Sequence, residues 1–391
     1  MIIRAPVEIK LYSRESVELP DIIKERLPKI QFVFQPKNSE DIQWLFSYSR
    51  KNGLSLIPRG AATSSSGAIA PLQRSVMADL TSLNRILDFD QKRKTISIEA
   101  GLRWRDLRHF LNKHSLDLFT YPTSLFSTVG GWLSTGGFGI NSFRYGHVSS
   151  AVDSIEVVTP QRKTWLGSKD HDFKYFIGAE GQMGVITKVK LKVRELQASK
   201  SYLILFKKSG EAVCFLLELL KSPGIQPIHI SYFDHNRLEQ KNLLFKGRVS
   251  FPESEAVLVV FEGPFSEQSF LSLAAKNKGM LAEDYLSSFL WNERFFPFSL
   301  RSVYSSLLGS EIILPVHRLE TFLTKTRIFG ENHHLQLSSE ASLINRNEAA
   351  VFTIFPSDPK KLAHFFHLLL TYSLARTALS CGGKPYGIGL W

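Results

Sequence analysis

The sequence predicts an α+β protein of two domains, on three observations. First, 391 residues exceed what a single hydrophobic core usually serves. Second, short strands alternate with helices, and glycine-rich loops lie between them, up to about residue 195. Third, from about residue 200 longer strands alternate with helices and several of the segments end at prolines, which is typical of an antiparallel sheet with helices on one face. We place the boundary at residues 194–200.

The first domain begins with a predicted βαβ unit. Residues 32–36 and 54–58 are strand-like and flank a helix at residues 38–53, with Asn38 or Ser39 as its cap and Gly53 at its end. The segments 85–90 and 95–100 alternate as a hairpin does, and 150–160 pairs with 163–167. Other strands are expected at residues 75–80 and 184–193, and a helix at residues 102–114.

The second domain is expected to contain five strands and two long helices. The strand-like segments are residues 201–208, 228–234, 255–263, 310–316 and 349–356, and the helix-like segments are residues 210–222 and 359–377. No internal repeat is present.

Charge and cysteine content narrow the function classes. The chain has a net charge of +12, and such a charge attracts anionic substrates or lipids. Lysines spread over a solvated surface are the simpler explanation of this charge. Nucleic acid ranks last, because no nucleic-acid motif is present. The two cysteines, Cys214 and Cys381, lie far apart and exclude a disulfide framework, a structural zinc site and an iron–sulfur cluster made by this chain alone. Redox chemistry would therefore need an organic cofactor or a partner.

The sequence carries no targeting or membrane signal that we recognise. Its first twenty residues lack the apolar core of a secretory signal, and the later apolar runs are short or interrupted by charges. We expect a cytoplasmic protein, and contact with the cytoplasmic face of a membrane stays open.

Three glycine-rich turns in the first domain indicate a long ligand. Residues 58–67 follow a strand with small residues and hydroxyls, which suits a phosphate, although any single loop of this kind is a weak signal. Residues 127–147 contain six glycines, and residues 178–187 turn into a strand. Neither a P-loop nor a complete GxGxxG fingerprint is present. Three such turns could wrap a ligand with a central pyrophosphate and flat ends, which is the shape of FAD.

These segments, together with 95–107 and 121–147, resemble the FAD domain of the vanillyl-alcohol oxidase and p-cresol methylhydroxylase (PCMH-type) flavoprotein family. The similarity is greatest to FAD-linked glycolate and D-lactate dehydrogenase subunits. It implies an FAD domain of two subdomains (residues 1–195), a cap or substrate domain (200–375), and the start of a return segment (376–391) that is cut short at Trp391. The FAD contacts that it implies are Arg59, Gly60, Ala61, Ala62, Thr63, Ser64, Pro122, Thr123, Ser124, Thr128, Val129, Gly130, Gly131, Gly136, Gly137, Tyr145, Gly146, Glu180, Gly181, Gly184, Val185 and Ile186.

Departures from the family pattern refine these expectations. Ala61 and Ala62 stand where some relatives bind the flavin covalently through histidine, so we expect non-covalent FAD. We expect a structural role for His147 and no metal site, because the HxGDGNxH segment of related dehydrogenases is missing. The candidates for substrate binding or catalysis in the cap are weak, since each is more often structural; they are Arg294, Arg301, His317, His333 and His334.

The resemblance implies hydride transfer from a 2-hydroxy acid or related alcohol to flavin N5, while a base takes the hydroxyl proton. Electrons would pass to a quinone or an iron–sulfur partner. Two alternatives stay open: an FAD-binding electron-transfer subunit without its own substrate, and a sugar-lactone or alditol oxidase of the same family.

Overall fold

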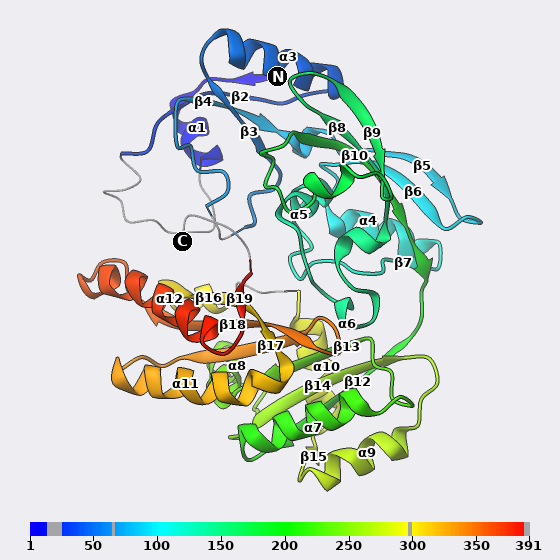
Figure 1. Ribbon diagram of the computed structural model, residues 1–391, viewed down its shortest axis with the longest axis vertical. Helices are drawn as coiled ribbons and strands as arrows, with labels where there is room; N and C mark the ends of the chain where they lie inside the picture. Colours follow the sequence, from blue (N-terminus) through cyan, green and yellow to red (C-terminus); the bar gives the residue numbers. More distant parts are fainter. Residues whose placement is uncertain (14–25, 65–66, 296–298, 387–391) are drawn as a thin grey trace. The chain divides into compact units, whose positions relative to one another are not determined.

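The computed structural model describes residues 1–13, 26–64, 67–295 and 299–386, which form two compact units. The first contains Met1–Gly139 and His147–Leu196, and the second contains Ile140–Gly146 and the described residues from Gln197 to 386 (Figure 1). The sequence placed the boundary at residues 194–200, and the structure has it after Leu196. The short excursion of Ile140–Gly146 into the second unit was not foreseen. Residues 387–391, in the expected return segment, lie outside the described residues.

The first unit contains two main sheets that share a core. The first has the order β1-β2-β4-β3 and the second the order β5-β6-β10-β8-β9. The strands are β1 (Ile2–Ile3), β2 (Ile30–Phe34), β3 (Ser55–Arg59), β4 (Ser75–Asp79), β5 (Ile86–Asp90), β6 (Thr95–Glu99), β8 (Val152–Val158), β9 (Lys163–Gly167) and β10 (Val185–Lys192); a small pair joins β7 (Leu116–Asp117) to β11 (Arg194–Glu195). The helices are α1 (Pro6–Tyr12), α3 (Ser39–Lys51), α4 (Trp104–Lys113) and α5 (Val129–Thr135).

Helix α3 connects the two sheets. The Asn38 side chain caps it by accepting from the Asp41 N–H at 2.9 Å, as the sequence predicts. Ile42 and Leu45 pack against strands of the first sheet and against Val158 of the second. At the helix start, Ser39 donates to the buried carboxylate of Glu156 on β8. One hydrophobic cluster and one buried hydrogen bond therefore hold both sheets to the same helix.

The predicted pairings in the first unit are mostly correct. The β5–β6 hairpin and the β8–β9 pair are confirmed, both antiparallel. The predicted βαβ unit is only partly correct, because β2 and β3 are parallel to β4, which lies between them. The crossover through α3 thus skips one strand position.

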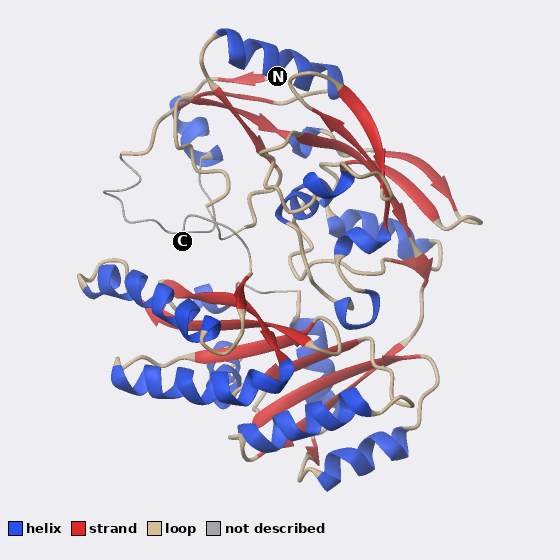
Figure 2. Cartoon of the chain, viewed as in Figure 1, coloured by secondary structure: helices blue, strands red, loops and turns tan. Residues whose placement is uncertain are grey.

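The second unit is built on one antiparallel sheet of order β15-β12-β14-β13-β17-β18-β16-β19. Its strands are β12 (Ser199–Phe206), β13 (His229–Phe233), β14 (Glu255–Glu262), β15 (Met280–Leu281), β16 (Ser306–Pro315), β17 (Ser338–Leu343), β18 (Glu348–Ser357) and β19 (Lys384–Pro385). Its helices are α6 (Ser142–Tyr145), α7 (Ser209–Lys221), α8 (His235–Leu244), α9 (Glu267–Lys276), α10 (Asp284–Glu293), α11 (Leu319–Asn332) and α12 (Ala363–Leu379) (Figure 2).

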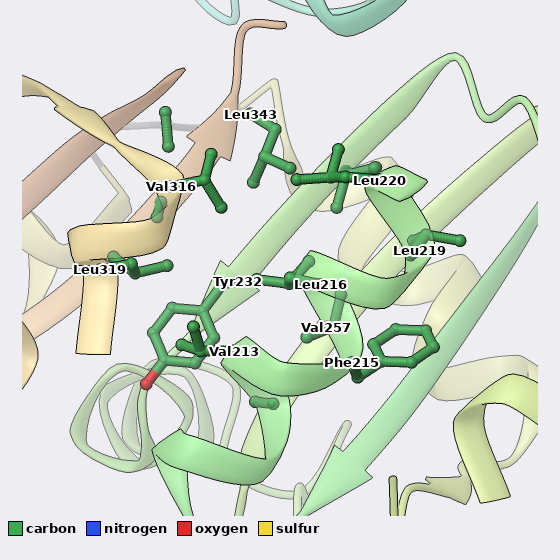
Figure 3. Close-up of a cluster of buried hydrophobic side chains, with 14 of the residues drawn as sticks. Val213, Phe215, Leu216, Leu219, Leu220, Tyr232, Val257, Val316, Leu319 and Leu343 are labelled. Carbon is green, nitrogen blue, oxygen red and sulfur yellow. The ribbon is translucent and has the colours of Figure 1, made fainter. Parts of the chain in front are cut away.

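Helices cover both faces of this sheet. On one face, Leu216 of α7 and Leu319 of α11 pack with Tyr232 and Val257 of the strands in the larger core (Figure 3). On the other face, Leu238 of α8 and the apolar side of α10 form a second cluster. The prediction of helices on one face is therefore wrong. Helices α8 and α10 are joined by the buried pair Lys241 and Glu293, with Nζ and Oε2 2.5 Å apart.

No helix in the described ranges has both the length and the hydrophobicity needed to cross a bilayer.

Gly101 provides a test of packing in the first unit. A Cβ on this residue would lie 1.8 Å from the carbonyl oxygen of Leu80 and 2.6 Å from that of Leu83. Because both neighbours are backbone atoms, Gly101→Ala should lower the free energy of unfolding by about 3 kcal/mol or more. Thermal and urea unfolding measure this. Gly224→Ala is the control, since its Cβ would meet nothing within 4 Å, and an equal effect of the two substitutions contradicts the packing described.

Candidate functional site

The first two glycine-rich turns meet inside the first unit. A Cβ on Gly60, in the turn after β3, would lie 2.4 Å from Thr128 Oγ1 and 3.5 Å from Gly131 Cα. A Cβ on Gly131 would in turn lie 2.7 Å from the same oxygen. These separations are too short for real side chains. The start of α5 therefore approaches the β3 turn backbone to backbone only because both positions are glycine.

The third turn packs on the opposite end of α5. The Gly178 N–H donates to Leu133 O at 3.0 Å, and the Glu180 N–H donates to Ser134 O at 2.7 Å. Gly178 also faces Gly136, whose Cβ would lie 3.0 Å from the Gly178 Cα. The C-terminal carbonyls of α5 thus receive their hydrogen bonds from the third turn.

Gly181 brings the third turn into contact with the first. A Cβ there would lie 2.5 Å from Cγ of Pro58, the residue that precedes the first turn by two positions. Its φ of +79° is also one that glycine adopts readily. The three turns that the sequence singled out are therefore in mutual contact.

The first turn presents backbone donors. Among the described residues, none accepts a hydrogen bond from the N–H groups of Ala61, Ala62 and Thr63. Ala62 has φ +53°, in the left-handed region, and its side chain packs against the buried cluster that contains Ile69 and Met77. Successive N–H groups around such a residue can form an anion-binding concavity. Ser64 belongs to the same half-buried turn, whereas Ser65 lies outside the described residues.

Arg59 supports this turn. Its Nη1 donates to Gly60 O at 3.1 Å, and its Nε donates to the carbonyl of Tyr12 at 3.2 Å. Nη1 also lies 3.9 Å from Oδ1 of buried Asp79 in an ion pair, and Asp79 Oδ2 accepts a hydrogen bond from Gln35 at 3.0 Å. The guanidinium places a positive charge beside the donor turn and ties that turn to α1.

Three glycines among the expected FAD contacts, Gly130, Gly131 and Gly137, have contacts within the protein. The Gly130 N–H donates to Ala100 O at 2.7 Å and is therefore not available to a pyrophosphate. Gly130 is needed because a Cβ would lie 2.6 Å from that of Ala100. The Gly131 N–H is also engaged, at 3.2 Å from Thr128 Oγ1. Gly137 makes room for the indole of Trp132, 2.6 Å from its Cβ position, rather than for a ligand.

His147 is structural, as expected. Its Nε2 accepts from the Gly137 N–H at 2.8 Å, and its Nδ1 lies 2.9 Å from Ser149 Oγ. The Ser149 N–H also donates to Nδ1 at 3.3 Å, so a backbone N–H faces each ring nitrogen. Burial lowers the pKa of His147. The neutral ring therefore holds the chain on both sides of the excursion into the second unit.

The third turn contributes one titratable group. Glu180 has φ +50° and is half-buried, and burial raises the pKa of its carboxyl. Gly184 has φ +148°, and its Cβ would lie 2.8 Å from Val158 O. Val185 and Ile186 are buried sheet residues on β10 that pair with β8. These two residues position the turn and are not exposed on it.

The other predicted contacts divide between the units. Pro122, Thr123 and Ser124 lie in a turn of the first unit, where Ser127 Oγ donates to Ser124 O at 2.6 Å. Thr128 caps α5, and Val129 is fully buried. Tyr145 and Gly146 belong instead to the second unit.

The candidates in the cap do not form one cluster. His317 and the pair His333 and His334 are exposed at opposite ends of α11, whose 14 residues span about 21 Å. Arg301 is exposed in a single turn at Ser299–Ser302. The Arg294 guanidinium stacks 3.5 Å from the ring centre of Trp291.

No three His, Cys, Asp or Glu side chains in the described part of the chain gather closely enough to hold a metal ion. The expected absence of a metal site stays a prediction.

Three supporting residues were missed in the sequence. Tyr12 and Asp79 fix Arg59 from segments distant in the chain, and nothing local marks them. Gly178 was visible as a further glycine in the third turn, and its contact with Gly136 explains it.

The His147 geometry predicts a pH effect on stability. The folded-state pKa lies below the ordinary 6.5, so the unfolded chain takes up the proton first as the pH falls. The free energy of unfolding should therefore decrease as the pH drops below about 6.5, and His147→Gln should remove this part of the decrease. Urea unfolding between about pH 7.5 and 5.5 measures it. His109→Gln, at an exposed position, should keep the wild-type dependence; identical profiles for all three proteins contradict the assignment.

Comparison with known proteins shows which proteins resemble the unit that contains these turns. The model of a family described as "FAD binding domain" matches residues 30–165, which include the first two turns. The alkyldihydroxyacetonephosphate synthase of Dictyostelium discoideum is 30% identical over 55% of this chain and 38% of its own length. The D-2-hydroxyglutarate–pyruvate transhydrogenase DLD3 of Saccharomyces cerevisiae is 30% identical over 48% of this chain and 38% of its own length. The chain thus spans less than half the length of these two curated relatives.

A solved structure of an alkyldihydroxyacetonephosphate synthase has the same fold. It superposes with a TM-score of 0.81 at 21% identity and covers 98% of this chain and 78% of its own. The likeness extends over both units and confirms the expected α+β architecture of a PCMH-type FAD domain followed by a cap with an antiparallel sheet. Residues 30–165, which carry two of the three converging turns, therefore match the family described as "FAD binding domain".

Proposed function

We propose that this chain is an FAD-dependent dehydrogenase that oxidises a 2-hydroxy acid or related alcohol. The observation that carries the proposal is the convergence of the three glycine-rich turns in the unit that contains the FAD-binding family match. The name of the transhydrogenase relative, with a 2-hydroxy acid as substrate, supports this substrate class. FAD, when bound, supplies the acceptor for the hydride removed from the substrate carbon.

The described residues fit an anionic cofactor. The N–H groups of Ala61, Ala62 and Thr63 are available within a turn that carries the Arg59 charge. A pyrophosphate is the chemical group that such a donor set accepts. Thr63 and Ser64 add hydroxyl donors. The alanines at 61 and 62 offer no side chain for a covalent bond, which supports dissociable FAD.

The remaining turns serve to hold this donor set in place. Thr128 and Gly131 support it from α5, and Pro58 fixes it against Gly181 of the third turn. Glu180, with its raised pKa, is protonated more readily than an exposed glutamate and can then donate a hydrogen bond to a polar edge of the cofactor. We assign no residue of the cap as the base. A quinone or an iron–sulfur protein is our proposed electron acceptor.

A second candidate is a synthase of the alkyldihydroxyacetonephosphate type. It is favoured by the first of the two curated relatives above and by the solved structure, whose names state that activity. An electron-transfer subunit and a sugar-lactone or alditol oxidase also stay as alternatives.

Anaerobic titration of the purified flavoprotein distinguishes these functions. A panel of 2-hydroxy acids, alditols and sugar lactones is added, and the flavin absorption band is followed. The proposal expects at least one hydroxy acid to bleach the band. Bleaching by an alditol or lactone alone favours the oxidase. A flavin that stays oxidised with every compound contradicts the dehydrogenase proposal, and formation of an alkyldihydroxyacetone phosphate then supports the synthase.

The cofactor site is tested separately by Gly131→Val. The new side chain would displace Thr128 and separate α5 from the first turn, so FAD affinity should fall by at least about 100-fold, or 2.7 kcal/mol. Fluorescence titration with FAD measures the affinity. The same substitution at Gly167 is the control, because the nearest atom to its Cβ would lie at 3.5 Å. Near-ultraviolet circular dichroism shows whether both variants are folded. Unchanged FAD affinity in Gly131→Val contradicts the site.

A further inference from the structure

The outer side of α12 is unusually apolar. Leu369 is 65% exposed, Phe366 62% and Tyr372 57%, values that are high for side chains of this size. With 3.6 residues per turn, the exposed apolar residues fall on one stripe about 140° wide. This α12 stripe consists of Leu362, Phe365, Phe366, Leu369, Tyr372 and Leu379.

The stripe is additional to the side of the helix that packs on the sheet. Leu374 is fully buried with Phe355 and Leu308, and Ala378 joins the larger core. Thr371 is buried on the same inner side. Helix α12 is thus apolar on two opposite sides. An exposed apolar stripe of this extent is typical of a surface that contacts another apolar phase or partner.

Charge on the stripe itself has one sign, whereas the neighbouring α11 carries the exposed Glu331 beside its basic residues. Residues 362–379 contain no aspartate or glutamate. Lys360 and Lys361 are exposed immediately before the helix, and Arg376 is exposed within the stripe. Lys325 and Arg327 are exposed on the neighbouring α11, and Lys325 Nζ donates to Ser380 Oγ at 2.9 Å. The whole chain carries a net charge of +12.

These charges indicate which kind of partner can bind the α12 stripe. A second copy docked through the same stripe would bring Arg376 and the lysines of one molecule against those of the other, which is repulsive. An apolar partner without charge would leave the basic rim without counter-charges. An anionic lipid surface satisfies both features, because phosphates meet the basic side chains while aromatic and aliphatic side chains enter the interface.

We propose that the α12 stripe binds the surface of an anionic lipid bilayer, with the helix in the plane of the interface. Phe366 and Leu369 would enter the acyl boundary, and Lys360, Lys361 and Arg376 would contact lipid phosphates. This inference goes beyond the proposed redox function and does not rest on it. It gives the net positive charge a specific partner.

The test is sedimentation of the full chain with vesicles. Vesicles of phosphatidylglycerol and phosphatidylcholine in equal parts are compared with pure phosphatidylcholine. We expect binding to the anionic vesicles, at least about tenfold weaker binding to the neutral ones, and loss of binding at high salt. The double variant Phe366→Ser with Leu369→Ser should weaken anionic binding at least about tenfold.

The matched control removes two other exposed leucines. Leu72 is 72% exposed and Leu243 52%, and both lie outside the stripe. Leu72→Ser with Leu243→Ser should bind vesicles like the wild type. Absence of vesicle binding, equal loss in both double variants, or a concentration-dependent dimer that only the stripe variant abolishes would overturn the proposal. Far-ultraviolet circular dichroism and a cooperative thermal unfolding transition show that each variant is folded, so its result counts.

Discussion

The candidate cofactor site depends on the close approach of three backbones. Gly60 meets Thr128, Gly136 meets Gly178, and Gly181 meets Pro58. At each contact a Cβ would stand 3.0 Å or less from the neighbouring atom. Close packing of this kind leaves little freedom, so the positions of the turns are fixed together and not one at a time. The backbone N–H donors of residues 61–63 are held in place by contacts between the three turns.

The same constraint explains why glycine is so frequent in the first unit. Ordering a glycine costs more backbone entropy than ordering any other residue. The cost is offset where the glycine permits hydrogen bonds that a side chain would prevent, as at Gly130, whose N–H reaches Ala100 O. The buried carboxylate of Glu156 supports the other side of the unit: burial opposes its charge, but hydrogen bonds from Ser39, Thr187 and Lys188 outweigh this and lower its pKa.

Local signals predicted the local structure well. The Asn38 cap, the β5–β6 hairpin and the three turns all follow from residues close in sequence. Strand order did not, because nothing within residues 30–59 shows that β4 will lie between β2 and β3. Helices α8 and α10 were not predicted from the sequence. They pack on the sheet and on each other, and the residues that make these contacts, such as Lys241 and Glu293, are distant in the chain. The resemblance likewise identified Val185 and Ile186 as FAD contacts from their position in the motif. Only the structure shows that their side chains are buried in the core of the sheet.

The excursion at Ile140–Gly146 has a consequence for how the protein can be divided. Within the described residues, the chain passes between the units three times: after Gly139, after Gly146 and after Leu196. Phe143, in the middle of the excursion, packs against the large core of the second unit. A fragment ending at Leu196 would retain Phe143 and lose the core that covers it. The FAD-binding unit is therefore continuous in space but not in sequence, and a cut at the apparent domain boundary would not separate two independent folding units.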